Sequence, residues 1–243
     1  VRTLQHGAIR HGAQVTEPPS ERRHPTSYYG PNSGFGLAVK ALQAQNRPLN
    51  IAVIGLGTGT TAAYGRKGDL IRFYEINPQV VDFAQRHFTY LGDSEAKVEI
   101  SLGDARLSLE RENDIAFDVI AVDAFSGDSI PTHLITREAM DAYLRRLKPD
   151  GALLIHTTNR YLSLAPVVKT LADNRGLSTA IIEHEPSDEE SNAQQSDSDW
   201  VIVTRNENFL AREPLKSRSG EIPAREGVSL WTDDYNNLYR ILK

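Results

Sequence analysis

Cysteine is absent from this chain of 243 residues, and methionine occurs only once. The missing thiols exclude disulfides and thiolate metal sites, and they suit a reducing compartment. Basic residues are not in excess either: 27 lysines and arginines stand against 32 acids, which gives a net charge of −5. A nucleic-acid-binding surface is therefore not expected, whereas a cationic small molecule suits such a protein.

Long apolar runs are also missing. No segment approaches the roughly 20 apolar residues of a membrane-spanning helix, and no signal peptide is visible. We therefore expect a cytoplasmic protein, or the cytoplasmic part of a protein whose membrane segment precedes Val1. The length fits one large domain with a small appendage.

What the sequence does contain is a regular alternation of strand-like and helix-like segments. Short apolar runs predict strands over 51–55, 70–75, 97–101, 117–122, 151–156, 179–183 and 200–204. Helices are predicted over 35–45, 59–66, 78–91, 137–147 and 166–175, with a short one after Asp104. This alternation predicts an α/β fold, a Rossmann-like, doubly wound sheet of about seven strands.

The N-terminal segment and one late polar segment depart from this alternation. Residues 1–45 are predicted to form a small N-terminal β-hairpin region, and 46–243 the Rossmann-like catalytic domain that binds the cofactor. The acidic stretch 185–199 is expected to be a solvated loop between two late strands, consistent with a terminal hairpin.

The first predicted strand runs into a glycine-rich loop, IAVIGLGTGT at residues 51–60. Gly55, Gly57 and Gly59 permit unusual backbone angles and a close approach of a ligand. Glu75 ends the next strand, where an acidic residue accepts hydrogen bonds from ribose hydroxyls. The pattern predicts a cofactor that contains a nucleoside. Thr60 stands where the dinucleotide fingerprint requires glycine, which argues against a nicotinamide cofactor.

Carboxylates follow successive predicted strands: Glu75, Asp104, Asp123 and, after a loop, Asp128. Open α/β sheets bind their ligands at this edge. Asp123, at the end of a buried strand, is therefore placed to contact a bound ligand. The alternatives are structural: Asp104 caps a helix, and Asp128 belongs to an ordinary turn.

Three motifs in order resemble the S-adenosylmethionine (AdoMet)-binding superfamily: the glycine loop, the acid at 75 and Gly103-Asp104-Ala105. The segment VIAVDAFSGDSIPTHLITREAMDAYLRRLKPDGALLIHTTNRYL at 119–162 resembles the spermidine synthases, or polyamine aminopropyltransferases. The early HGAIRHGAQ and TSYYG and the closing SLWTDDYNNLYRIL are similar to the same family. Bacterial spermidine-synthase-like domains that often follow membrane segments are the most similar group.

The resemblance implies a methyltransferase-type Rossmann-like fold and transfer of an aminopropyl group from decarboxylated AdoMet to a diamine, releasing 5′-methylthioadenosine. It implies that the donor is bound by Gly55, Gly57, Thr58, Gly59, Glu75, Asp104, Ala105 and Gln14. Asp123 is the implied catalytic residue, and Asp128 is grouped with it. Tyr28 and Tyr29 either cover the substrates or are aromatic residues of the core. Asp233 and Asp234 either line the acceptor pocket or cap a terminal helix. No metal is required, and the expected partners are a small-molecule amine and a second copy in a homodimer.

Two positions depart from the family pattern. Thr58 stands where the synthases carry an aspartate that grips the terminal amine of the donor, and Ser126 stands where they repeat an aspartate. Losing a negative charge beside the donor tail removes repulsion against the α-carboxylate of intact AdoMet, so AdoMet itself is a candidate donor. Methyl transfer, self-cleavage of AdoMet and nucleoside binding without turnover remain alternatives. His133 and His156 are expected to be packing residues.

Overall fold

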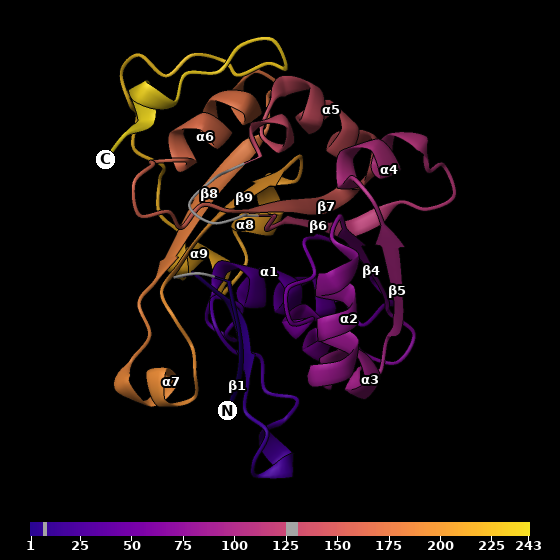
Figure 1. Ribbon diagram of the computed structural model, residues 1–243. Coiled ribbons are helices and arrows are strands. Elements are labelled where there is room, and N and C mark those ends of the chain that lie inside the picture. Colours follow the sequence, from indigo (N-terminus) through magenta and orange to yellow (C-terminus); the bar gives the residue numbers. More distant parts are fainter. Residues whose placement is uncertain (7–8, 125–130) are drawn as a thin grey trace.

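A seven-stranded sheet forms the centre of the computed structural model, which describes residues 1–6, 9–124 and 131–243 (Figure 1). Its strands follow the spatial order β5 (Lys97–Leu102), β4 (Leu70–Glu75), β3 (Asn50–Ile54), β6 (Phe117–Val122), β7 (Leu147–His156), β9 (Ser198–Thr204) and β8 (Ser178–His184). The first five strands are parallel, whereas β9 runs antiparallel to both β7 and β8. The predicted α/β fold is confirmed, and each predicted strand is present: 70–75 and 117–122 match in full, and the others differ at their ends by at most four residues.

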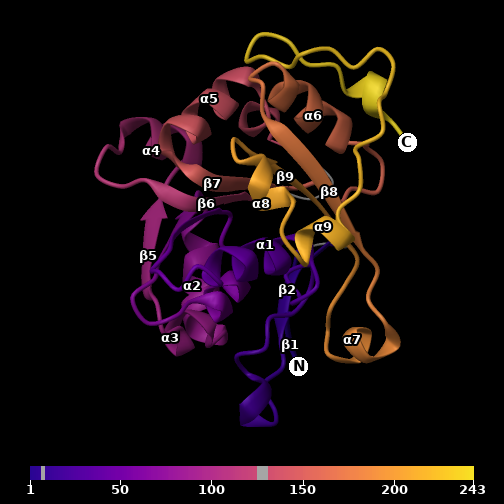
Figure 2. The same cartoon turned by 180° about the vertical axis from the view of Figure 1, so that it is seen from behind.

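Helices cover both faces of this sheet (Figures 1 and 2). On one face pack α1 (Gly34–Gln43), α2 (Pro78–His87), α3 (Tyr90–Asp93), α8 (Glu207–Leu210) and α9 (Leu215–Arg218). On the other face pack α4 (Ala105–Arg111), α5 (Arg137–Arg146) and α6 (Ala165–Asp173). None of the helices in the described ranges has the length and apolarity needed to cross a membrane.

Strand β3 shows why the central strands are apolar throughout. Ile51 and Val53 pack into the core on the α1 side, and Ala52 and Ile54 into the core on the α5 side. Successive side chains of a strand point to opposite faces, so a strand that is covered on both faces has no polar side.

Several predicted elements differ in detail. The helix predicted over 59–66 is a short 3₁₀ helix, η2 (Thr60–Tyr64), because it lies between Gly59, which is left-handed, and Gly65, which is extended. The helix predicted over 78–91 is interrupted at Phe88, whose backbone is extended and whose side chain is buried.

The polar stretch 185–199 is not wholly a loop. It holds α7 (Asp188–Asn192), which begins with a capping box formed by Ser187 and Glu190. The segment after Asp234 forms a 3₁₀ turn, η4 (Leu238–Ile241). Two further 3₁₀ turns are η1 (Pro19–Glu21) and η3 (Thr132–Leu134).

The N-terminal strands β1 (Arg2–His6) and β2 (Ile9–Gln14) form a separate antiparallel sheet, which confirms the predicted small β-region. β2 lies against the loop that follows β3. A Cβ at Gly12 would come within 2.5 Å of the Thr58 hydroxyl oxygen. The hairpin therefore packs directly on the glycine-rich loop, at the carboxyl ends of the parallel strands.

Candidate functional site

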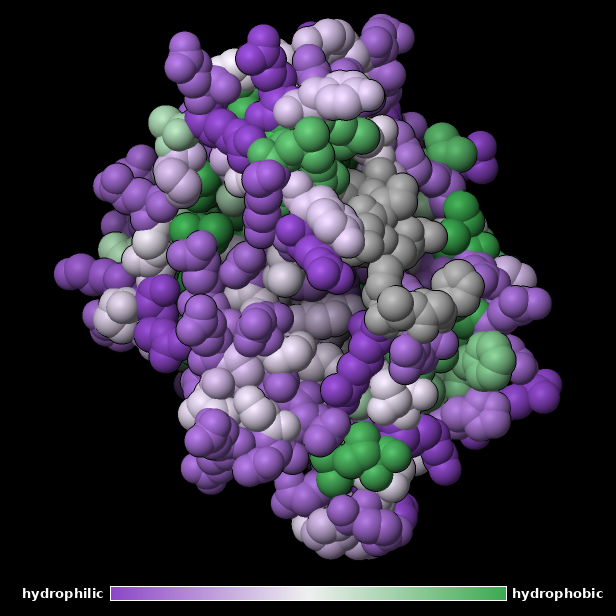
Figure 3. All heavy atoms as spheres, turned by 60° about the vertical axis from the view of Figure 1, so that its left-hand side comes forward, coloured by the Kyte–Doolittle hydropathy of each residue, from purple (hydrophilic) through white to green (hydrophobic). Residues whose placement is uncertain are grey.

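A cleft of about 620 Å³ lies between the carboxyl ends of the parallel strands and the N-terminal hairpin. The face shown in Figure 3 is mainly hydrophilic and is hollowed near its centre. Of the predicted site residues, the cleft is lined by Tyr28, Tyr29, Gly55, Gly57, Thr58, Glu75, Asp104, Ala105 and Asp123. The fold therefore brings most of the predicted donor-binding residues together with the predicted catalytic aspartate. Asp128, the other predicted catalytic residue, lies outside the described residues.

The glycine-rich loop is held between β6 and the hairpin. Gly55 has φ +98°, and a Cβ there would collide with the carbonyl oxygen of Asp123. Gly57 has φ +51°, and its Cβ would lie 2.9 Å from the His11 carbonyl oxygen. Glycine is required at both positions because the neighbouring backbones leave no room for a side chain. Gly59, left-handed as well, begins η2 and faces Leu91 rather than the cleft.

Glu75 joins this loop to the end of β4. One carboxylate oxygen accepts the Leu56 N–H at 3.0 Å, and the other accepts the Asn77 N–H at 2.8 Å. The residue is 8% exposed and lines the cleft. A carboxylate has about four acceptor positions, so each oxygen keeps one for a further donor. That arrangement suits a pair of hydroxyls on one ligand.

Asp104 has a structural role and a cleft-lining position at once. Its Oδ1 accepts the Leu107 N–H at 2.8 Å and so caps α4. Its Oδ2 lies 3.2 Å from Nε2 of His133, which also lines the cleft. Ala105 follows as the first residue of α4.

The Asp123 carboxylate is enclosed, with its side chain 6% exposed. Its Oδ1 lies 2.8 Å from Nδ1 of His156, and its Oδ2 accepts a hydrogen bond from the Tyr29 hydroxyl. A buried carboxylate is costly unless such groups compensate it. Burial, together with the nearby Asp123 charge, raises the pKa of Tyr28 and of Tyr29 well above the usual value. Both tyrosines therefore stay protonated as hydrogen-bond donors at neutral pH.

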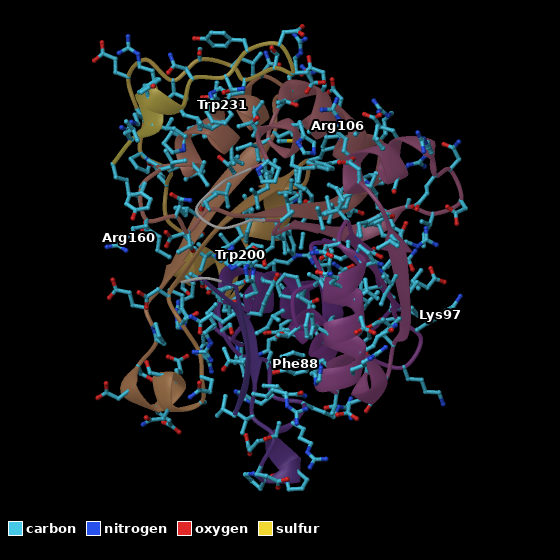
Figure 4. All side chains as sticks on the ribbon, in the orientation of Figure 1. Phe88, Lys97, Arg106, Arg160, Trp200 and Trp231 are labelled. Atoms are coloured by element: carbon cyan, nitrogen blue, oxygen red, sulfur yellow. The ribbon has the colours of Figure 1, made fainter. Side chains whose placement is uncertain are left out.

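His156 is fixed by aromatic rings on both sides. Its imidazole stacks on Tyr28, with centroids 4.4 Å apart, and on Trp200, with centroids 4.8 Å apart. The indole N–H of Trp200 donates to the Tyr28 carbonyl oxygen at 3.1 Å. Figure 4 shows Trp200 in the interior of the fold. The predicted packing role of His156 omits its hydrogen bond to Asp123. The contact could have been predicted from the position of His156, because this residue ends a strand that pairs with the strand leading to Asp123.

The structure places three other predicted residues outside the cleft lining. Gln14 is fully buried and connects the hairpin to Thr89 through hydrogen bonds of 2.7 and 3.0 Å. Asp233 forms a two-pronged pair with Arg106, at 2.7 and 2.6 Å, and Asp234 is exposed. Within the described part of the chain, no group of three or more histidine or acidic side chains is arranged to hold a metal.

No protein-family model matches the chain. Among curated proteins, the polyamine aminopropyltransferase of Vibrio vulnificus (strain CMCP6) is 32% identical over 131 residues, which are 50% of this chain and 42% of that protein. The chain spans less than half the length of the curated relatives that it matches. The similarity to polyamine aminopropyltransferases that the sequence motifs predict is confirmed.

Solved structures confirm the fold. A probable spermidine synthase from Corynebacterium glutamicum ATCC 13032 superposes with a TM-score of 0.55 at 18% identity, covering 74% of this chain and 65% of that one. Human methyltransferase-like protein 13, solved in complex with SAH, gives a TM-score of 0.56 at 18% identity, with coverages of 74% and 84%. Spermidine synthases and AdoMet-dependent methyltransferases share this architecture, so the architecture alone does not separate the two activities.

Proposed function

We propose that this protein is a transferase that moves the alkylamine side chain of a sulfonium nucleoside to a small amine and releases 5′-methylthioadenosine. The observation that carries the proposal is the enclosed Asp123 carboxylate, which shares one cleft with Glu75 and the glycine-rich loop. The name of the matching Vibrio vulnificus relative supports the same reaction class.

The donor would lie across the strand ends. Glu75 would accept the ribose hydroxyls with its two remaining acceptor positions, and Asp104 with Ala105 would lie beside the adenine. Gly55 and Gly57 would allow the close approach of the ligand along the loop backbone. The reactive carbon would then face Asp123.

In the reaction, the lone pair of the acceptor nitrogen attacks the carbon next to the sulfonium. The N–C bond forms as the C–S bond breaks, the bonding pair stays on sulfur, and the positive charge moves to nitrogen. Free alkylamines are mostly protonated at neutral pH, so the site needs an anion that accepts a proton or stabilises the new cation. Asp123 supplies that anion, and the excess proton leaves the product nitrogen. Tyr29 and His156 hold the carboxylate in a fixed orientation, which supports preorganised stabilisation of charge.

Methyl transfer would use the same nucleoside but attack its methyl carbon and leave S-adenosylhomocysteine. The enclosed Asp123 favours the amine reaction, because methyl transfer has no general need for a buried carboxylate beside the acceptor. Thr58, which is neutral where spermidine synthases have an acid, keeps self-cleavage of AdoMet as a second candidate.

Product identification tests the proposal. The protein is incubated with AdoMet or decarboxylated AdoMet, with and without putrescine, and the nucleoside product is identified by mass. Methylthioadenosine that forms only with the amine supports the proposal. The same product without the amine indicates self-cleavage, S-adenosylhomocysteine indicates methyl transfer, and no product indicates a binding module.

The Asp123→Asn variant tests the role of the carboxylate. We expect turnover to fall at least about 100-fold, because asparagine cannot accept a proton or balance a cation. The affinity for methylthioadenosine should be retained, since the nucleoside contacts lie elsewhere. Asp93→Asn, at an exposed position, is the matched control. Normal turnover in Asp123→Asn would remove this residue from the mechanism.

A further inference from the structure

Arg10 and Arg160 line the cleft, and among the described residues neither has a carboxylate partner. The guanidinium of Arg10 donates to the neutral Gln194 amide at 2.9 Å, and Arg160 lies over the ring of Tyr161. Within the described ranges, neither forms an ion pair with an acid. Arg160 stands at the rim of the fold in Figure 4. By contrast, Arg72, away from the cleft, pairs with three acids.

Arg10 belongs to the part of the hairpin that packs on the glycine-rich loop. It directly precedes His11, whose carbonyl oxygen would lie 2.9 Å from a Cβ at Gly57. Gly12 follows, and a Cβ there would come within 2.5 Å of the Thr58 hydroxyl oxygen. The register of β2 shifts between Arg10 and Gly12, so the strand does not simply alternate its faces here. Arg10 lies next to the residues that contact the loop, and it lines the cleft.

The hairpin side and the sheet side of the cleft carry different charged residues. The acids among the described lining residues are Glu75, Asp104 and Asp123, all of them at the strand ends. On the hairpin side the loop offers Thr58, whose hydroxyl is 2.8 Å from that of Thr60. Among the lining residues that the structure describes, the hairpin contributes the cation Arg10, and the acids lie on the sheet side.

We infer that the donor carries a carboxylate at the end of its alkyl chain, so that intact AdoMet is preferred over decarboxylated AdoMet and the transferred group is 3-amino-3-carboxypropyl. This inference rests on the proposed function and on its placement of the donor. With the ribose at Glu75 and the reactive carbon at Asp123, the donor tail passes the glycine-rich loop toward Arg10. A guanidinium binds a carboxylate through two parallel N–H···O bonds. The decarboxylated tail ends in an ammonium group, which Arg10 repels.

The bond changes are those of the proposed reaction. The acceptor nitrogen bonds to the carbon next to sulfur, the C–S bond breaks with its electron pair on sulfur, and methylthioadenosine leaves. One proton passes from the nitrogen to the Asp123 carboxylate and from there to water. The product differs from an aminopropyl adduct by one carboxylate.

Isothermal titration calorimetry with three nucleosides tests the inference: AdoMet, decarboxylated AdoMet and methylthioadenosine, which lacks the tail. We expect the wild type to bind AdoMet at least about tenfold more tightly than the decarboxylated form, a difference of about 1.4 kcal/mol. Arg10→Gln should weaken AdoMet binding by about the same factor and leave methylthioadenosine binding unchanged. Arg10→Glu should reverse the preference. Arg111→Gln, at the exposed end of α4, is the matched control.

Equal or tighter binding of decarboxylated AdoMet by the wild type would overturn the inference. So would an Arg10→Gln variant that weakens all three nucleosides alike, because a general structural change would do that. The product assay keeps the two proposals apart. Methylthioadenosine formed from decarboxylated AdoMet and putrescine, without an AdoMet preference in binding, sinks the inference and leaves the proposed function standing. An AdoMet preference without amine-dependent product overturns the proposed transfer and the identity of the transferred group, and it leaves only the preference for the carboxylate-bearing nucleoside standing.

Discussion

The cleft has two halves that the chain builds in different ways. We define the nucleoside half as Gly55, Gly57, Glu75 and Asp104, and the acid half as Tyr28, Tyr29, Asp123, His156 and Trp200. In the nucleoside half, the carboxylates accept backbone N–H groups that are 2, 3 and 19 residues away in the sequence. In the acid half, the hydrogen bonds join residues 33, 94 and 172 positions apart.

The two halves of the cleft therefore depend on different parts of the fold. The nucleoside half needs the β3–loop–β4 unit and the turn from β5 into α4. The acid half needs the N-terminal region, β6, β7 and β9 to be in place together. Variants should therefore affect ligand affinity and turnover separately, except where the halves touch.

The largest effect is expected where the halves touch, at Gly55. In Gly55→Ala, the added Cβ meets the Asp123 carbonyl oxygen, and alanine is strained at φ +98°. Strain and overpacking together should lower the free energy of unfolding by about 3 kcal/mol or more. Denaturant titration measures this loss, and both affinity and turnover should fall with it.

Gly92→Ala is the matched control for that variant, since its Cβ would have no heavy atom within 4 Å and the residue lies in α3. Its stability should be unchanged or slightly higher, because alanine favours a helix over glycine. A Gly55→Ala protein as stable as the wild type would show that the contact between the two halves is looser than the structure indicates.

A smaller effect, confined to the nucleoside half, is expected for Glu75→Gln. The amide keeps one acceptor oxygen, so one of the two backbone N–H groups and part of the ribose site lose their partner. The affinity for methylthioadenosine should fall about 10- to 100-fold, since an unsatisfied buried donor costs about 1–3 kcal/mol. Calorimetry checks this value, with Asp123→Asn as the opposite case in which affinity is retained. If both variants lost affinity equally, the division of the cleft would be wrong.

The smallest effect is expected for Asp233→Asn, outside both halves. The hydrogen-bonded Arg106 guanidinium holds the pKa of Asp233 below its usual value. Because the folded-state pKa is depressed, the pair stabilises the fold above the unfolded pKa of about 3.9, and this stability is lost as pH falls through the folded pKa. The side chain is 40% exposed, so solvent screening limits the loss in the variant to under about 1 kcal/mol at pH 7.

Urea titrations at pH 7 and near pH 2 test this prediction, since the difference from the wild type should vanish in acid. Substrate affinity should stay the same. A weaker amine affinity in Asp233→Asn would return this residue to the acceptor site, where the sequence hypothesis put it.

The sequence by itself determined the alternation of strands and helices, the glycine-rich loop and the acids that end β4 and β6. These follow from short-range rules: apolar periodicity, the backbone freedom of glycine, and the position of a residue at the end of a strand. The same rules misjudged elements whose ends depend on their surroundings. The predicted helix 78–91 stops at Phe88, for example, where a buried side chain and an extended backbone interrupt it.

Only the tertiary structure decided which side chains meet. It turned Gln14 into a buried link to Thr89 and paired Asp233 with Arg106, away from the cleft. It also brought His156 to Asp123 and placed Arg10 in the lining of the cleft. These encounters join segments far apart in the chain, and their partners are fixed by strand order and by packing between elements. Neither the strand order nor the packing between elements can be predicted from a local pattern of residue types.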